Sequence, residues 1–197
     1  MRKLVVDDIA DLRAYERERD DLRRAIIAMK RHRRIAVGPF VTLVFENTDT
    51  MRWQVQEMAR VERMLRDEQI AHEVETYNRL IPDAGELSAT MMIELTSELA
   101  LRHWLPQLVG IEHNVAVELA DGTRGSGHTS EDDEARLTRA ETTSAVHFLR
   151  FAFTPSEIAT FAAGPVRVVI DHPAYEHRTV LDDMSQAALL GDLRAAD

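Results

Sequence analysis

Residues 143–155 read TSAVHFLRFAFTP, and they decide the fold because a long strand and the start of a helix meet within them. Side chains of a strand alternate between its two faces. One face carries His147 among leucine and phenylalanine, and the other carries Arg150 among valine, phenylalanine and alanine. Thr154 followed by Pro155 is the order typical of a helix start. The stretch therefore predicts a strand covered on both faces, central in its sheet and followed by a short helix.

Similar patterns extend outward from this strand in both directions. Period-two alternation or short apolar runs predict further strands at 35–37, 41–46, 90–95, 114–119, 166–171 and 175–181. Helical periodicity and capping residues predict helices at 7–34, 47–69, 72–78, 96–109, 154–163 and 182–193. Several strands are joined by connections too short for a crossover helix. We therefore predict an α+β fold with a mixed, mainly antiparallel sheet and helices packed on one side.

The length and composition are those of one globular domain. The chain has 197 residues, of which 45% are hydrophobic and 29% are charged, so it can bury a substantial core. We predict a single α+β domain over residues 1–197. The polar segment at about 121–139, which contains the acidic run 131–134, is the best candidate for a mobile loop.

Several classes of protein are disfavoured by composition. The absence of cysteine excludes disulfides, thiolate nucleophiles and cysteine-ligated metal centres. The net charge of −10 argues against a nucleic-acid partner, because phosphate binding needs a basic surface. No apolar run approaches the roughly 20 residues that span a bilayer, and the N-terminus has no apolar stretch of signal-peptide length. We predict a cytoplasmic protein with no membrane partner.

One local stretch departs from the acidic balance. Leu22–Arg34 holds six Lys or Arg residues and no acid. A helix whose cationic end complements its macrodipole explains this pattern. A site for an anion or an acidic partner explains it as well.

Candidate metal ligands gather where a predicted strand meets a proline. Residues 171–177 read DHPAYEH and include Asp171 and His172. Together with His147 and Glu94 they offer the imidazole and carboxylate ligands that suit iron, zinc or manganese. His177 and Tyr175, from the same run, are further candidates. Two alternatives stay open, namely histidines held by structural hydrogen bonds and a histidine that acts as a general base.

Two other charged residues need an explanation. Arg150 on a half-buried strand requires a carboxylate partner, because an unpaired buried charge is costly; Glu94 and Asp171 are plausible partners. Glu57 and Arg60 are three residues apart on a predicted helix and can pair on its solvated face. Alternatively, Glu57 points into a cleft as a ligand or general base.

Several stretches together resemble one bacterial family, the domain-of-unknown-function family 3501. The stretches that carry the resemblance are 33–39, 56–60, 77–83, 89–94, 144–151 and 171–175. The similarity runs from about Leu4 to Leu190, and the family carries no established activity. Its members resemble accessory proteins encoded beside rubrerythrin-like proteins and cysteine-rich iron–sulfur oxidoreductases. The resemblance thus implies a role close to peroxide detoxification or electron transfer under oxidative stress.

Three hypotheses follow for the function. The first is an accessory protein of redox metalloproteins that holds a metal through His147, Asp171, His172 and Glu94. The second is a metal-assisted hydrolase or oxidase that uses the same side chains and requires them to converge in a cleft. The third is a non-catalytic interaction module, whose basic stretch and acidic loop meet oppositely charged partner surfaces.

Overall fold

The computed structural model describes residues 1–130, 138–139 and 141–195. Ten strands form two four-stranded antiparallel sheets and a two-stranded ribbon in this part of the chain. The first sheet has the order β1 (Arg34–Val37), β2 (Val41–Glu46), β3 (Glu86–Ile93), β8 (Val146–Ala152). The second has the order β10 (Tyr175–Val180), β9 (Arg167–His172), β4 (Val115–Glu118), β5 (Arg124–Ser126). The ribbon pairs β6 (Thr138–Arg139) with β7 (Thr142–Thr143).

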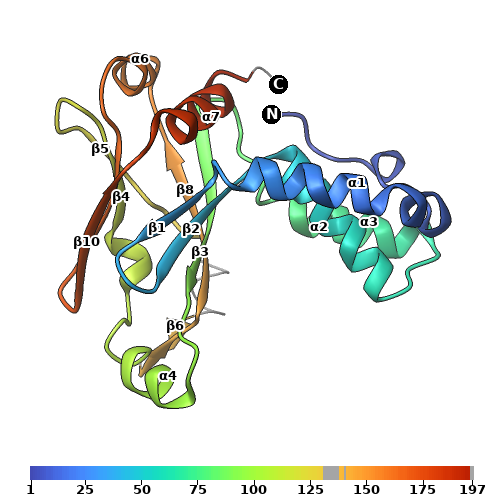
Figure 1. Ribbon diagram of the computed structural model, residues 1–197, viewed down its shortest axis with the longest axis horizontal. Coiled ribbons are helices and arrows are strands. Elements are labelled where there is room, and N and C mark those ends of the chain that lie inside the picture. Colours follow the sequence, from blue (N-terminus) through green and yellow to red (C-terminus); the bar gives the residue numbers. More distant parts are fainter. Residues whose placement is uncertain (131–137, 140, 196–197) are drawn as a thin grey trace.

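The main hydrophobic core lies between the two four-stranded sheets. Both sheets contribute alternate residues to it, among them Leu43, Phe151 and Val168, which have no exposed surface or almost none. This alternation is the signature of strands with one face on the core. The two sheets therefore form a sandwich of two layers (Figure 1).

The sandwich is closed along both edges. On one edge the hydroxyl of Thr179 on β10 donates to the carbonyl of Ala36 on β1 at 2.7 Å. On the other, the backbone of His128, just after β5, exchanges two 2.8 Å hydrogen bonds with Arg150 on β8. Because both open edges are covered, the molecule approaches a flattened barrel.

Helices close the ends of the sandwich. Figure 1 shows α6 (Pro155–Ala163) and α7 (Asp183–Arg194) at one end and α4 (Glu98–Trp104) at the other. Thr154 and Asp182 cap α6 and α7 with their side-chain oxygens. A buried ion pair joins Arg33, next to β1, to Asp192 on α7, with the second contact (Nη2 to Oδ1) at 2.9 Å. This pair fixes the C-terminal helix to the first strand.

Three helices form an arm on the outer side of the first sheet (Figure 1). The helical arm consists of residues 1–30 and 48–78, with the 3-10 turn η1 (Val6–Asp8), α1 (Leu12–Lys30), α2 (Thr48–Val61) and α3 (Asp67–Asn78). It has its own small core of Leu4, Met51, Val55, Val74 and Ile81. Asn47 caps α2 by accepting a hydrogen bond from the backbone of Thr50 at 2.9 Å. None of the described helices is both long and apolar enough to cross a membrane.

The α+β fold and the antiparallel pairing predicted from the sequence are confirmed. The strands divide into two sheets, and β8 lies at the end of its sheet order, whereas a central strand was predicted. It is nevertheless covered, because His128 pairs with its free side. Within the predicted mobile loop at about 121–139, the structure has the strands β5 and β6, and the acidic run 131–134 lies outside the described residues.

Candidate functional site

Three of the four predicted metal ligands lie on strands of two different sheets, and the fourth, Glu94, directly follows the end of β3. His147 is on β8 and faces the core, while Asp171 and His172 are on β9 of the other sheet. As neighbours on one strand, Asp171 and His172 point to opposite faces, and only His172 is buried. Among the described residues, no group of three or more His, Asp or Glu side chains is placed to hold a metal ion. The convergence that a shared metal site or a metal-assisted hydrolase requires is therefore not found there.

Each of these four side chains contacts a separate partner. The Nε2 of His147 lies 2.9 Å from the Thr143 hydroxyl and 3.0 Å from the Ser144 carbonyl. Burial lowers the pKa of His147, and the nearby Glu112 carboxylate opposes that shift. This environment favours the neutral imidazole.

The two carboxylates of the set are held by arginines. Glu94 pairs with Arg34 and accepts a hydrogen bond from Thr42 at 2.6 Å, which together lower the pKa of Glu94, the Thr42 bond most strongly. Asp171 pairs with Arg124. Neither carboxylate is the partner of Arg150, which instead binds Glu86 at 2.6 Å. The prediction that Arg150 has a carboxylate partner is confirmed, but the partner is on the adjacent strand β3.

His172 and Tyr175, both in the run 171–177, form hydrogen bonds that hold loops in place. His172 accepts a hydrogen bond from the backbone of Ala174 and contacts the Val109 carbonyl with Nε2, both at 3.2 Å. The hydroxyl of Tyr175 donates to the Val37 carbonyl at 2.8 Å and accepts from the backbone of Phe40 and Val41. These contacts clamp the β1–β2 turn against the second sheet.

His177 completes this clamp by packing. Its ring lies edge-on to Tyr175, with centroids 4.4 Å apart. Gly38 adopts a φ of +77°, and a Cβ there would lie 2.5 Å from the ring of His177. Glycine is thus required at this turn both for conformation and for space.

Glu57 lies at the centre of an ion-pair network that joins α1 to α2. Arg19 contacts both of its oxygens, at 2.8 and 2.9 Å, and Tyr15 donates its hydroxyl at 2.6 Å. Arg60 contacts the same carboxylate from within α2. The Arg19 hydrogen bonds are the main reason that the pKa of Glu57 falls from 4.5 to about 2. The carboxylate therefore stays ionised near neutral pH and is already saturated with donors, which suits a structural role.

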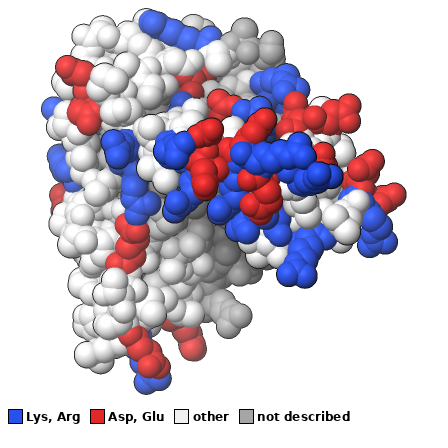
Figure 2. Space-filling view, turned by 45° about the vertical axis from the view of Figure 1, so that its right-hand side comes forward, with Lys and Arg blue, Asp and Glu red and all other residues white. Residues whose placement is uncertain are grey.

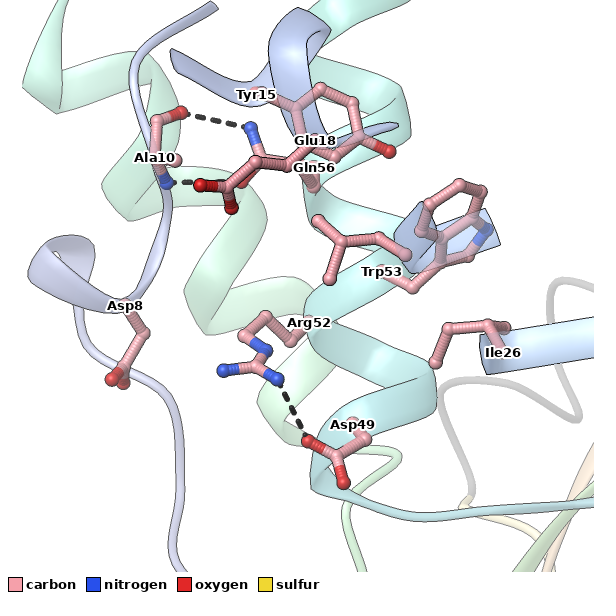
Figure 3. Close-up of a pocket in the computed structure, with 10 residues that line it drawn as sticks. Asp8, Ala10, Tyr15, Glu18, Ile26, Asp49, Arg52, Trp53 and Gln56 are labelled. Atoms are coloured by element: carbon pink, nitrogen blue, oxygen red, sulfur yellow. Dashed lines mark hydrogen bonds and ion pairs between the residues drawn. The ribbon is translucent and has the colours of Figure 1, made fainter. Parts of the chain in front are cut away.

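Next to this network, α1 and α2 enclose a groove with a cavity volume of about 180 Å³. The groove is named here the α1/α2 groove, and its apolar part consists of Tyr15, Leu22, Ile26 and Trp53. The rings of Tyr15 and Trp53 meet edge to face at 6.0 Å between centroids. Figure 3 shows Tyr15, Ile26 and Trp53 around a common space between the two helices, and Leu22 also lines it.

The floor of the groove is rigid. Tyr15 is 1% exposed, and its hydroxyl is fixed by Glu57. The buried amide of Gln56 binds the backbone of Ala10 at both ends, with contacts of 3.0 and 2.8 Å (Figure 3). Tyr15 and Gln56 therefore support the partly exposed ring of Trp53, and a preorganised surface binds a partner at lower entropic cost.

The rim of the groove is charged and predominantly acidic. Asp49 pairs with Arg52 at 3.0 Å, and Asp8 pairs with Arg2 at 2.6 Å. Glu18 is exposed and forms no ion pair within the described part of the chain. Figure 2 shows acidic and basic side chains interleaved over the arm, beside a largely uncharged strand layer.

The outer half of α1 leaves apolar surface uncovered. Between Asp20 and Ala28 every side chain except Ile26 is exposed, and Leu22 and Ile27 are 36% and 46% exposed. Large apolar groups at an exposed groove with an aromatic floor are typical of protein contact sites. The sequence indicated this helix, but Trp53 was not predicted as a site residue.

Half of the six cations in the basic stretch Leu22–Arg34 form internal ion pairs. Arg33 binds Asp192, Arg34 binds Glu94 and Arg24 binds Asp21. Arg23, Lys30 and Arg31 form no ion pair among the described residues. The stretch therefore offers less free positive charge than its composition predicted.

Comparisons with known proteins found a matching family model and a similar solved structure. Residues 3–193 match the model of the family described as protein of unknown function (DUF3501). The chain is also similar to a crystal structure described as a novel protein of unknown function from Burkholderia pseudomallei K96243. The two share 36% sequence identity and a TM-score of 0.89, with 98% of this chain and 100% of the other covered. No curated protein matches the chain.

Proposed function

The chain belongs to the DUF3501 family, and we propose that it is a cytoplasmic accessory protein that binds a partner protein through the α1/α2 groove. The observation that carries this proposal is the groove itself. It combines a rigid Tyr15–Trp53 floor with exposed aliphatic side chains on α1. A tryptophan at the centre of such a patch is often a residue that dominates the binding energy of a protein interface; the buried Tyr15 supports Trp53 from below.

The chemistry of the groove defines the partner segment. An apolar side chain of the partner fills the space beside Trp53 and Leu22. A lysine or arginine about one helical turn away meets Glu18, the rim carboxylate without an ion pair among the described residues. An amphipathic helix laid along a groove presents this combination of groups.

The family resemblance supplies the class of partner. A redox metalloprotein, either rubrerythrin-like or an iron–sulfur oxidoreductase, is the partner that we propose. The accessory role then lies close to oxidative-stress chemistry that the partner's metal performs. The groove contributes recognition, and the redox step belongs to the partner.

Calorimetric titration with a purified rubrerythrin-like protein or iron–sulfur oxidoreductase from the same organism tests the proposal. We expect saturable binding to the natural sequence and at least about tenfold weaker binding to Leu22→Asp and Trp53→Ala, since central interface residues contribute about 2 kcal/mol or more. Leu99→Asp on α4, where Leu99 is 81% exposed, is the matched control and should bind normally.

Two results would overturn the proposal. Equal affinity of Leu22→Asp and the natural sequence would remove the groove from the interface. Concentration-dependent dimers in sedimentation that Leu22→Asp abolishes would assign the groove to a second copy of this chain.

A further inference from the structure

A row of polar side chains crosses the outer face of the first sheet. Backbone register places Glu46 on β2 opposite Ser88 on β3, and Ser88 opposite Arg150 on β8. Glu46 and Ser88 are 5% and 2% exposed. Buried polar groups on a sheet are normally satisfied by a partner, so such a row needs an explanation.

A pocket with a cavity volume of about 390 Å³ opens over the Ser88 and Arg150 end of this row. The end of α3 forms one wall with Arg79 and Leu80, and the segment after β5 forms another with His128 and Thr129. Phe148 on β8 adds an apolar surface. Pockets of this size, apolar with a few convergent polar groups, are typical of small-molecule sites.

Donors that the protein does not use face this pocket. Ser88 is almost completely buried, lines the pocket and has no side-chain hydrogen bond within the described residues. Glu46, opposite Ser88 on β2, accepts a hydrogen bond from Thr90 with one oxygen, and its buried Oε2 has no partner among the described residues. Arg79 is exposed and forms no ion pair among the described side chains. A ligand acceptor would satisfy Ser88, and a negative charge would meet Arg79.

Arg150 holds the pocket in shape without supplying free charge. Its guanidinium binds Glu86 at 2.6 Å, the Ile81 carbonyl at 3.2 Å and the Arg79 carbonyl. The Glu86 carboxylate balances the charge of Arg150. Arg79 is the exposed cation on the pocket wall, whereas the Glu46 carboxylate is buried behind Ser88 and does not line the pocket. These contacts also fix the chain segment that carries Arg79.

We infer that this pocket binds a small organic anion, a carboxylate or a phosphate monoester with an apolar body. Arg79 and His128 contact the anionic group, Ser88 donates a hydrogen bond, and the apolar body lies on Phe148 and Leu80. The site is separate from the α1/α2 groove and does not depend on the proposed protein partner.

Backbone amide shifts of the ¹⁵N-labelled protein, titrated with phenyl phosphate, benzoate and inorganic phosphate, test this inference. We expect saturable shifts at Arg79, Ser88 and His128 with at least one organic probe. Arg79→Gln should weaken that binding about tenfold, because a charge-assisted hydrogen bond is lost, and Ser88→Ala should weaken it while keeping the fold. Arg66→Gln, near the start of α3, is the matched control and should bind normally.

Three outcomes would overturn the inference. They are no saturable shift with any probe, shifts that Arg79→Gln leaves unchanged, and equal binding of inorganic phosphate and phenyl phosphate, which would leave the apolar surface without a role. Leu22→Asp should leave probe binding unchanged, so that failure at this pocket is distinguishable from failure at the groove.

Discussion

Arg19 on α1 and Glu57 on α2 form a two-point ion pair, with Nε to Oε1 at 2.8 Å and Nη2 to Oε2 at 2.9 Å. Tyr15 and Arg60 donate to the same carboxylate. Bidentate pairs with this geometry give both energy and direction. The network therefore sets the position of α1 against α2 and, with it, the width of the α1/α2 groove.

Glu57→Gln should lower the free energy of unfolding by about 1–2 kcal/mol, because charge-assisted hydrogen bonds to a half-buried carboxylate are lost. Urea denaturation measures this change. Glu98→Gln is the control, since Glu98 pairs with Arg102 on an exposed surface of α4. Equal effects of the two substitutions would show that the Glu57 network does not hold the arm together.

The same network makes a prediction about pH. The pKa of Glu57 is lowered from 4.5 to about 2 in the folded protein, chiefly by Arg19. The stabilisation that the ionised Glu57 gives to the folded protein is therefore complete above pH 4.5. It is lost as the pH falls from 4.5 toward 2. The stability difference between the natural sequence and Glu57→Gln should shrink over that window in urea titrations. A stability difference between the two proteins that stays constant from pH 4.5 down to pH 2 would contradict the lowered pKa of Glu57.

Tyr175→Phe should destabilise the fold by about 1–3 kcal/mol, although the ring still packs, because buried backbone groups lose their partner. The hydroxyl binds Val37, Phe40 and Val41 in the natural protein. Amide hydrogen exchange at Phe40 and Val41 should accelerate more than at Leu43 in the middle of β2. Unchanged amide exchange at Phe40 and Val41 would show that the Tyr175 hydroxyl is not needed to hold the β1–β2 turn.

Asp192→Leu should cost about 3–5 kcal/mol, because it leaves the guanidinium of Arg33 buried without its carboxylate. The double variant Arg33→Met with Asp192→Leu should recover most of this loss, since two apolar side chains replace the pair. Urea denaturation of the three proteins measures both effects. A double variant that is even less stable than Asp192→Leu would contradict this account.

Local sequence patterns were sufficient for most of the strands and for helix starts. Alternation identified β2 at its observed limits, Val41–Glu46, and Thr154–Pro155 marked the start of α6. Pairing across the chain was not readable in the same way. The contact of β4 with β9, for example, depends on residues about fifty positions apart, and no local pattern encodes it.

The residue types in the run 171–177 do not show whether these side chains bind a metal or hold loops in place. His172 and Tyr175 bind backbone groups of Val109 and Val37. Backbone groups carry no signature in the sequence, so the partners of these side chains appear only in three dimensions. The α1/α2 groove could not be predicted for the same reason, because it forms only where Trp53 on α2 packs against Tyr15 on α1.

Hydrogen exchange of the complex with the redox metalloprotein partner tests the central claim most directly. The account predicts slower amide exchange over residues 18–28 of α1 and 49–56 of α2 when the partner is added, and no change over α4. Protection confined to α4 or the strands, or no protection of α1, would contradict docking at the α1/α2 groove.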